Sequence, residues 1–193
     1  MLLLAVLCAA PAAGLAQDAI EWSLERRLTK GDFKGRVPAA APNASMSSIS
    51  IDAWWECERG ALVAAARAMF DPSRSWWRNT GGSVWGSAGG RTSSSQAQQE
   101  ARRNALLRDM QLLEHEQLHF DIAEVVVRRI TARFAGFKSA CAEAGGTDQI
   151  QQMVVQADRE LQEEQQRYDR ETAHGLNARA QEQWKRRIRV LLN

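Results

Sequence analysis

The feature that most constrains this chain is the sequence HEQLH at residues 115–119, which lies in the middle of a long run of helix-forming residues. That run extends from residue 95 to residue 134, and its apolar side chains recur at helical spacing. They form one stripe, which consists of Leu106, Leu107, Met110, Leu113, Leu118, Ile122, Val125, Val126 and Ile130. The sequence therefore predicts a long amphipathic helix, or two helices with a break near Asn104.

The spacing of two histidines in this helix predicts a metal site. His115 and His119 are four residues apart, so on a helix they share a face and can direct two imidazoles at one ion. Glu116 can reach a water molecule on that ion and accept its proton. This arrangement is typical of zinc hydrolases, which are most often peptidases. We therefore expect Zn²⁺ as the cofactor and Glu116 as the general base.

A catalytic zinc site takes three protein ligands, so a further residue has to complete the set. His174 is the remaining histidine, and Gly175 after it permits a close approach. The preference of zinc for nitrogen favours His174 as the third ligand. The alternative is a carboxylate of the same later segment, from Glu160, Glu163, Glu164 or Glu171. The metzincin pattern is excluded because Val125 stands where its third histidine would be.

Three further residues are candidates for supporting roles. Tyr168, the single tyrosine, could donate its hydroxyl to a developing oxyanion, or it could be buried with that hydroxyl satisfied. Asp121 and Asp169 could each orient an imidazole N–H group, or each could be a solvated charge on a helix.

Several segments resemble a known family. Residues 112–123, LLEHEQLHFDIA, look like the core motif of a bacterial family of predicted secreted zinc-dependent proteases, long described as a domain of unknown function. Residues 168–175, YDRETAHG, are similar to a second specific motif of that family, and weaker likeness extends over most of the chain after residue 16. The resemblance implies a zincin-like fold, with a small sheet packed on the active-site helix, and a metallopeptidase activity.

The N-terminus predicts export from the cytoplasm. Residues 2–16 form an apolar run without a charged residue, which is too short for a membrane span of about 20 residues. Gly14, Leu15 and Ala16 supply a small-x-small cleavage pattern. We therefore predict a signal peptide at residues 1–16 and a periplasmic or secreted protein. A buried N-terminal helix is the alternative.

Two cysteines, Cys57 and Cys141, remain after removal of the signal peptide. An even number of cysteines in an exported protein favours a disulfide. Two buried free thiols are the alternative.

The remaining patterns predict strands before the long helix and helices after it. We expect a short first strand near Trp22 with a turn at Gly31 and Asp32, and a second strand over residues 46–54. Residues 60–70 are rich in alanine and carry apolar residues at helical spacing, so we favour a helix there over a strand. Residues 81–90, rich in glycine, predict a flexible loop.

Two more helices are expected after the long one. They cover residues 148–172 and 177–192, and Trp184, Ile188 and Leu191 of the last one should face inward. The predicted fold class is therefore α+β and rich in helix, with residues 17–193 in a single zincin-like domain.

The function we predict is that of an exported zinc-dependent peptidase with a peptide or protein substrate. The formal net charge of +2 argues against nucleic acid as a partner, and no membrane span is expected after the signal peptide. The strand near residues 46–51 could receive an extended peptide as an added strand. One alternative is a non-catalytic, zinc-stabilised envelope-binding module that uses some of the seven tryptophans. Another is hydrolysis of a non-peptide amide by the same zinc chemistry.

Overall fold

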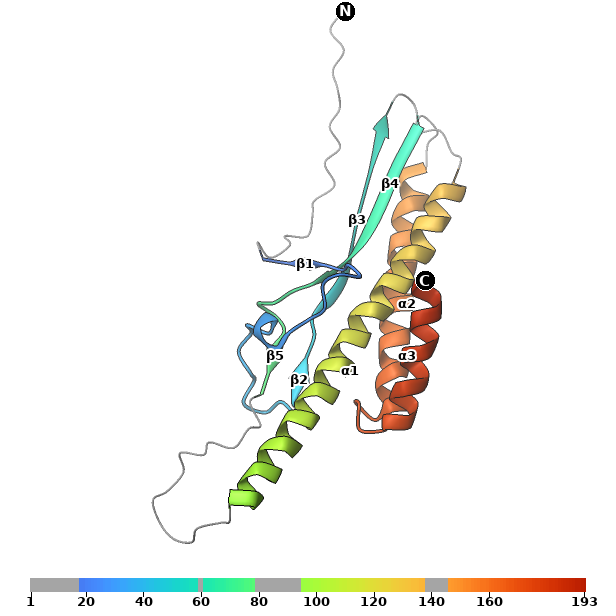
Figure 1. The fold of residues 1–193 in the computed structure, drawn as a ribbon. Helices are drawn as coiled ribbons and strands as arrows, with labels where there is room; N and C mark the ends of the chain where they lie inside the picture. Colours follow the sequence, from blue (N-terminus) through green and yellow to red (C-terminus); the bar gives the residue numbers. More distant parts are fainter. Residues whose placement is uncertain (1–17, 59–60, 79–94, 138–145) are drawn as a thin grey trace, which may run out of the picture.

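The computed structural model describes residues 18–58, 61–78, 95–137 and 146–193, and within them it shows an α+β fold (Figure 1). The strands come first, as β1 (Ile20–Glu21), β2 (Ser45–Met46), β3 (Ile49–Glu58), β4 (Ala61–Phe70) and β5 (Trp76–Trp77). The helices follow, as α1 (Ser95–Gly136), α2 (Gly146–Thr172) and α3 (Ala178–Leu192). The predicted signal peptide, the predicted loop at residues 81–90 and the cysteine at residue 141 lie outside the described residues.

The strands form two small antiparallel sheets. β4 is the centre of a sheet with the order β1-β4-β3, and β2 pairs with β5 in a second sheet. β3 pairs with β4 along its whole length, from Ile49 opposite Phe70 to Glu58 opposite Ala61. The strand predicted over residues 46–54 is therefore present in two pieces, β2 and the first part of β3, and β3 lies at a sheet edge.

The prediction of a helix over residues 60–70 is wrong, because residues 61–70 form the strand β4. Every second residue from 64 to 70 contacts the core on the helix side, and Ala68 and Phe70 are almost fully buried there. This period of two is the burial pattern of a strand. The alanines suited either structure, and the ten-residue pairing with β3 decides for the strand.

The predicted first strand is shorter than its apolar pattern indicated. β1 has two residues, although the Trp22 N–H still donates to the Ala68 carbonyl at 3.0 Å. Leu24, two residues after Trp22, is 64% exposed and lies outside the strand. The predicted turn at Gly31 and Asp32 is present as a short 3-10 helix over Lys30–Asp32.

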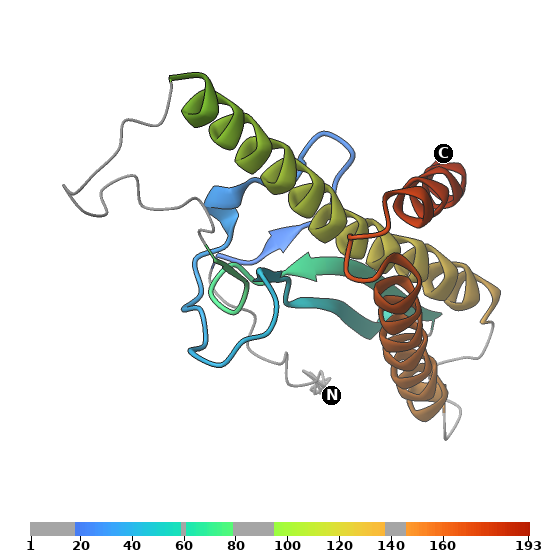
Figure 2. The same ribbon diagram turned by 90° about the horizontal axis from the view of Figure 1, so that it is seen from below.

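The central element of the fold is α1, which packs against β4 on one side and against α2 and α3 on another (Figures 1 and 2). It is a single helix without a break near Asn104. Its apolar stripe is buried from Leu118 onwards, whereas Leu106 and Met110 are exposed. The reason is geometric, because the N-terminal part of α1 projects beyond the sheet and the other helices (Figure 2).

The two C-terminal helices agree with the predicted ranges to within two residues. Asn177 caps α3, since its side chain accepts a hydrogen bond from the Ala180 N–H. Leu191, which was expected inside, is 43% exposed, and Leu192 is buried instead. Positions 184, 188 and 192 follow one another at intervals of four and so share the inward face.

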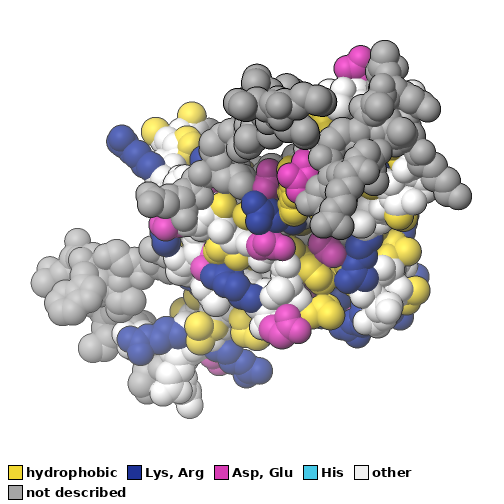
Figure 3. All heavy atoms as spheres, turned by 90° about the horizontal axis from the view of Figure 1, so that it is seen from above, with side chains coloured by type: hydrophobic (Ala, Val, Ile, Leu, Met, Phe, Trp, Pro, Cys, Tyr) yellow, Lys and Arg dark blue, Asp and Glu magenta, His cyan; other side chains and the backbone are white. Residues whose placement is uncertain are grey.

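The face of the molecule seen from above carries charges of both signs (Figure 3). On the face shown in Figure 3, basic and acidic side chains are interspersed with apolar ones. Among the described residues, no helix combines the length and the apolar character that crossing a bilayer would require.

Phe70 tests the packing of the sheet on α1. Its ring is fully buried and lies 5.2 Å from the Phe33 centroid and 6.0 Å from the Phe120 centroid. We expect Phe70→Ala to lower the free energy of unfolding by about 3–5 kcal/mol, because it leaves a cavity. Urea unfolding followed by circular dichroism measures this change. Leu24→Ala, at an exposed site, is the control, and equal midpoints for both variants would contradict this packing.

Candidate metal centre

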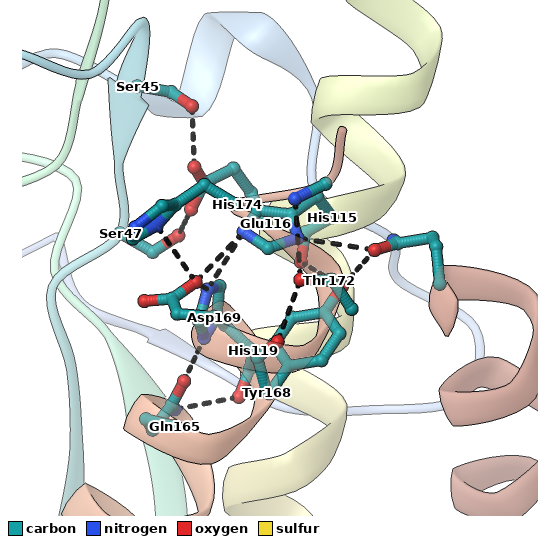
Figure 4. A network of polar contacts seen from close by, with 12 residues as sticks. Ser45, Ser47, His115, Glu116, His119, Gln165, Tyr168, Asp169, Thr172 and His174 are labelled. Carbon is teal, nitrogen blue, oxygen red and sulfur yellow. Dashed lines mark hydrogen bonds and ion pairs between the residues drawn. The ribbon is translucent and has the colours of Figure 1, made fainter. Parts of the chain in front are cut away.

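The middle of α1 and the C-terminal end of α2 bring the candidate site together (Figure 4). His115, Glu116 and His119 come from α1 and are 3%, 4% and 9% exposed. Asp169 comes from the last turn of α2. The two imidazoles and the glutamate therefore lie in the interior, where polar groups require partners.

Three potential ligand atoms converge at the centre of the site. Nε2 of His115 and Nε2 of His119 are 3.2 Å apart. Oδ1 of Asp169 lies 3.1 Å from the first nitrogen and 3.0 Å from the second. Ligand atoms bound to one tetrahedral zinc ion at its usual bond lengths are separated by about 3.3 Å. The three atoms thus have nearly the separations that a single ion imposes.

Two glutamines fix which nitrogen of each imidazole carries the proton. Gln165 presents its amide oxygen to Nδ1 of His119 and donates its N–H to the His119 carbonyl at 3.0 Å. Gln181 presents its oxygen to Nδ1 of His115 at 3.3 Å. An amide oxygen only accepts, so both Nδ1 atoms must be protonated. Both Nε2 atoms are then unprotonated in the neutral rings, and they face the carboxylate of Asp169.

Three acceptors at this distance repel one another unless a positive charge lies among them. Burial by itself lowers the pKa of His119, but its hydrogen bond with Asp169 and the charges of Glu116 and Asp169 raise that pKa above its ordinary value. Burial raises the pKa of Asp169, yet its hydrogen bonds with the two histidines hold it well below its usual range. The site therefore favours a cation, whether protons on the imidazoles or a metal ion.

His174 lies beside this group rather than within it. Its Nδ1 is 3.4 Å from Oδ1 of Asp169, and its side chain is 61% exposed. Among the described residues, the group whose ligand atoms all lie within 4.8 Å of one another consists of His115, His119 and Asp169. Asp169, for which the sequence left open an orienting role or a solvated charge, thus supplies the third converging atom, a place that the sequence assigned to His174.

The turn that carries His174 is strained. Ala173 and His174 have φ angles of 47° and 53°, and Gly175 follows with 82°. Such angles are costly for residues with a Cβ atom, and they persist where the surrounding structure imposes them. A Cβ atom on Gly175 would lie 3.1 Å from Cγ of His115, so the glycine is required for the turn to reach α1. The glycine thus lets the turn pass close to the His115 ring of α1.

The glutamates proposed as alternative ligands are directed elsewhere. Glu160 accepts a hydrogen bond from Arg133 at 2.8 Å, and Glu171 accepts one from Nε1 of Trp184 at 2.7 Å. Glu164 pairs with Arg167 at 2.8 Å, and Glu163 is exposed.

Tyr168 is fully buried beneath the site. Its ring stacks on His115 with centroids 4.7 Å apart, and its hydroxyl donates to the Gln181 oxygen at 2.7 Å. Burial raises the pKa of this hydroxyl, so it stays protonated. This geometry fits the alternative of a buried tyrosine with a satisfied hydroxyl. Asp121 accepts its described hydrogen bonds from Trp22 and Gln117, and it ties the N-terminal segment to α1.

The site opens into a cleft with a volume of about 980 Å³. The walls come from α1, from α2 and from the segment of residues 42–50, which includes β2. Both carboxylate oxygens of Glu116 accept hydrogen bonds from this segment, from the hydroxyls of Ser45 and Ser47.

Sequence reasoning missed the glutamines and the serines of the site. Gln165 is four residues before Asp169, so the helical spacing that places them on one face was visible in the sequence. Gln181, Ser45 and Ser47 carried no such signal, because they reach the site through the tertiary fold.

Comparison with known proteins identifies one matching family. Residues 90–175 match a family model described as "Bacterial protein of unknown function (DUF922)". This segment contains His115, Glu116, His119, Asp169 and His174, and it ends before Gln181. No curated protein and no solved structure matches the chain significantly. The likeness is thus to a bacterial family of unknown function, and it supplies no activity.

Gln165 tests the orientation of His119. We expect Gln165→Ala to weaken zinc binding by about 10–100-fold, because the residue that holds a metal-binding histidine contributes this much to affinity. Competition with a chromophoric chelator measures the affinity. Gln166→Ala, an exposed neighbour on the same helix, is the matched control and should bind zinc as the unaltered chain does. Equal affinities of the two variants would show that the Gln165 contact has no part in metal binding.

Proposed function

We propose that the protein is a zinc-dependent peptidase in which His115, His119 and Asp169 hold the metal ion. The observation that carries the proposal is the convergence of two imidazole nitrogens and a carboxylate oxygen within 3.0–3.2 Å of one another. An imidazole pair with one carboxylate is a donor set of catalytic zinc sites. We prefer Asp169 to His174 as the third ligand because its oxygen already lies between the two imidazoles.

Glu116 is the proposed general base. Zn²⁺ in such a site polarises a carbonyl group and makes water a nucleophile at neutral pH. Glu116 follows His115 directly on α1, and its carboxylate lines the same cleft as the three ligand side chains. In the proposed reaction it takes a proton from the attacking water and gives that proton to the leaving amine.

The shape and the lining of the cleft support an extended peptide as the substrate. Met46, Ser47 and Ile49 form part of one wall, where the sequence suggested that a peptide is added as a strand. β3, which begins at Ile49, is an edge strand of its sheet. The opposite wall from α2 presents the uncharged amides of Gln162 and Gln166, which can bind backbone N–H and carbonyl groups.

The burial of the tryptophans weighs against the alternative of a binding module. Among the described residues, Trp76, Trp77 and Trp184 are at most 8% exposed, and Trp54 is the one tryptophan that is largely exposed, at 46%. The described tryptophans thus serve the core more than a binding surface.

We further propose, from the sequence alone, that the protein acts outside the cytoplasm.

The choice of the third ligand is tested by two variants. We expect Asp169→Ala to lose zinc on gel filtration, whereas His174→Ala should retain about one ion per chain, because a third ligand is needed for tight binding. Metal analysis of the purified proteins gives the ratios, and circular dichroism checks that both variants are folded. The reverse result would give the third position to His174.

The role of the base is tested with Glu116→Gln. We expect the rate of peptide cleavage to fall by about 10²–10⁴-fold, because proton transfer is lost, while the zinc content stays the same. The substrates tested should include both peptides and non-peptide amides, so that the measurement distinguishes a peptidase from an enzyme that hydrolyses other amides. Glu163→Gln, an exposed change on α2, is the control. Unchanged turnover in Glu116→Gln would contradict the proposed mechanism.

A further inference from the structure

The carboxylate of Glu116 is held at both of its oxygens by residues of the segment that contains β2. Ser45 donates its hydroxyl to Oε1, and Ser47 donates its hydroxyl to Oε2 (Figure 4). Glu116 and Ser45 are each 4% exposed, so their contact is buried, whereas the contact of Glu116 with Ser47 is partly buried. The serines are about seventy positions away in the sequence, so the contact depends on the tertiary fold.

The backbone that carries the two serines is fixed without any help from Glu116. The Ala44 carbonyl accepts from the Arg78 N–H at 2.7 Å, and Ser45 pairs with Trp77 in the sheet of β2 and β5. At the other end, the Ser48 N–H donates to Oγ of Ser75 at 2.8 Å, and the Ser48 carbonyl accepts from the Asp71 N–H at 2.9 Å. The hydroxyls thus approach Glu116 from a segment that is anchored on both sides.

The spacing of the serines matches the two oxygens of one carboxylate. In an extended segment, residues two apart point to the same side, so Ser45 and Ser47 both face α1. Met46 between them is 37% exposed. Hydrogen bonds at both oxygens fix the plane of the carboxylate. An ionised carboxylate has about four acceptor positions, so two remain available for a water molecule and a proton.

A fixed carboxylate matters in this position because a metal ion would attract it. Glu116 adjoins His115, and its carboxylate lines the same cleft as the three proposed ligand side chains, Asp169 included. Carboxylates bind zinc readily, so a freely rotating Glu116 could coordinate the ion itself and cease to act as a base. A base also has to lie within about 2.6–3.2 Å of the group that it deprotonates. Hydrogen bonds from two anchored hydroxyls meet both requirements.

We propose that Ser45 and Ser47 are positioning residues that hold the Glu116 carboxylate beside the metal site and keep it from becoming a ligand. The inference rests on the proposed peptidase function, in which Glu116 moves a proton. It assigns a role in proton transfer to the segment that also forms one wall of the cleft.

Kinetics of the zinc-loaded full chain test the positioning role. With a peptide that the unaltered chain cleaves, we expect Ser45→Ala and Ser47→Ala each to lower kcat by about tenfold or more, as for partial loss of general base catalysis, while KM stays the same. Zinc content should also stay the same. Ser47→Thr, which keeps the hydroxyl, should recover most of the rate. Ser48→Ala is the control, because the described contacts of Ser48 come from its backbone.

A second measurement does not depend on turnover. In zinc-free protein, we compare the effect of Ser47→Ala on the urea midpoint in two backgrounds, the otherwise unaltered chain and a chain that carries Glu116→Ala. The decrease should be larger in the otherwise unaltered chain, because the Glu116→Ala chain lacks the carboxylate to which the hydroxyl donates. An equal decrease of the urea midpoint in both backgrounds would show that the Ser47 hydroxyl does not interact with Glu116. If the unaltered chain cleaves a peptide and both alanine variants keep its kcat, the positioning role alone is overturned. If the unaltered chain binds zinc and cleaves no substrate, the proposed function and the positioning role are overturned together.

Discussion

The candidate metal site depends on three acceptor atoms. They repel one another unless a positive charge lies among them. Nε2 of His115, Nε2 of His119 and Oδ1 of Asp169 are held within 3.2 Å of one another by a helix on each side. The arrangement is maintained from behind, because the amide oxygens of Gln165 and Gln181 accept hydrogen bonds from the Nδ1–H groups. Without these amides, each ring could turn its N–H group toward the centre and remove the need for a cation.

The fold serves this site by placing α1 in the middle. α1 contacts the sheet, α2 and α3, so a residue on any of its faces meets a different part of the chain. His115 and His119 face α2, where Asp169 and Gln165 lie, and Glu116 faces the segment that contains β2. One helical turn thus directs its two proposed ligands and its proposed base toward different parts of the fold.

The sequence predicted the parts of the structure that depend on local pattern. The long helix with HEQLH near its centre and the two C-terminal helices follow from helical spacing, and the structure has them. β4 could not be predicted, because an alanine-rich segment fits either structure until its pairing with β3 is known. The candidate metal site was predicted only in part. The spacing of His115 and His119 predicted that the two imidazoles converge, whereas the place of Asp169 beside them and of His174 outside the group depends on the path of the strained turn after α2.

That turn has a consequence for how the C-terminal helix and the imidazole of His115 depend on each other. The backbone at Gly175 passes so close to that ring that a Cβ atom there would lie 3.1 Å from its Cγ atom. Two residues later Asn177 starts α3, which returns Gln181 to Nδ1 of the same histidine. The ring is therefore enclosed by the loop on one side and by the helix that this loop begins on the other. A displacement of α3 would therefore move both the Gly175 turn and Gln181 against the imidazole of His115. The fifteen-residue C-terminal helix thus helps to hold this imidazole in place.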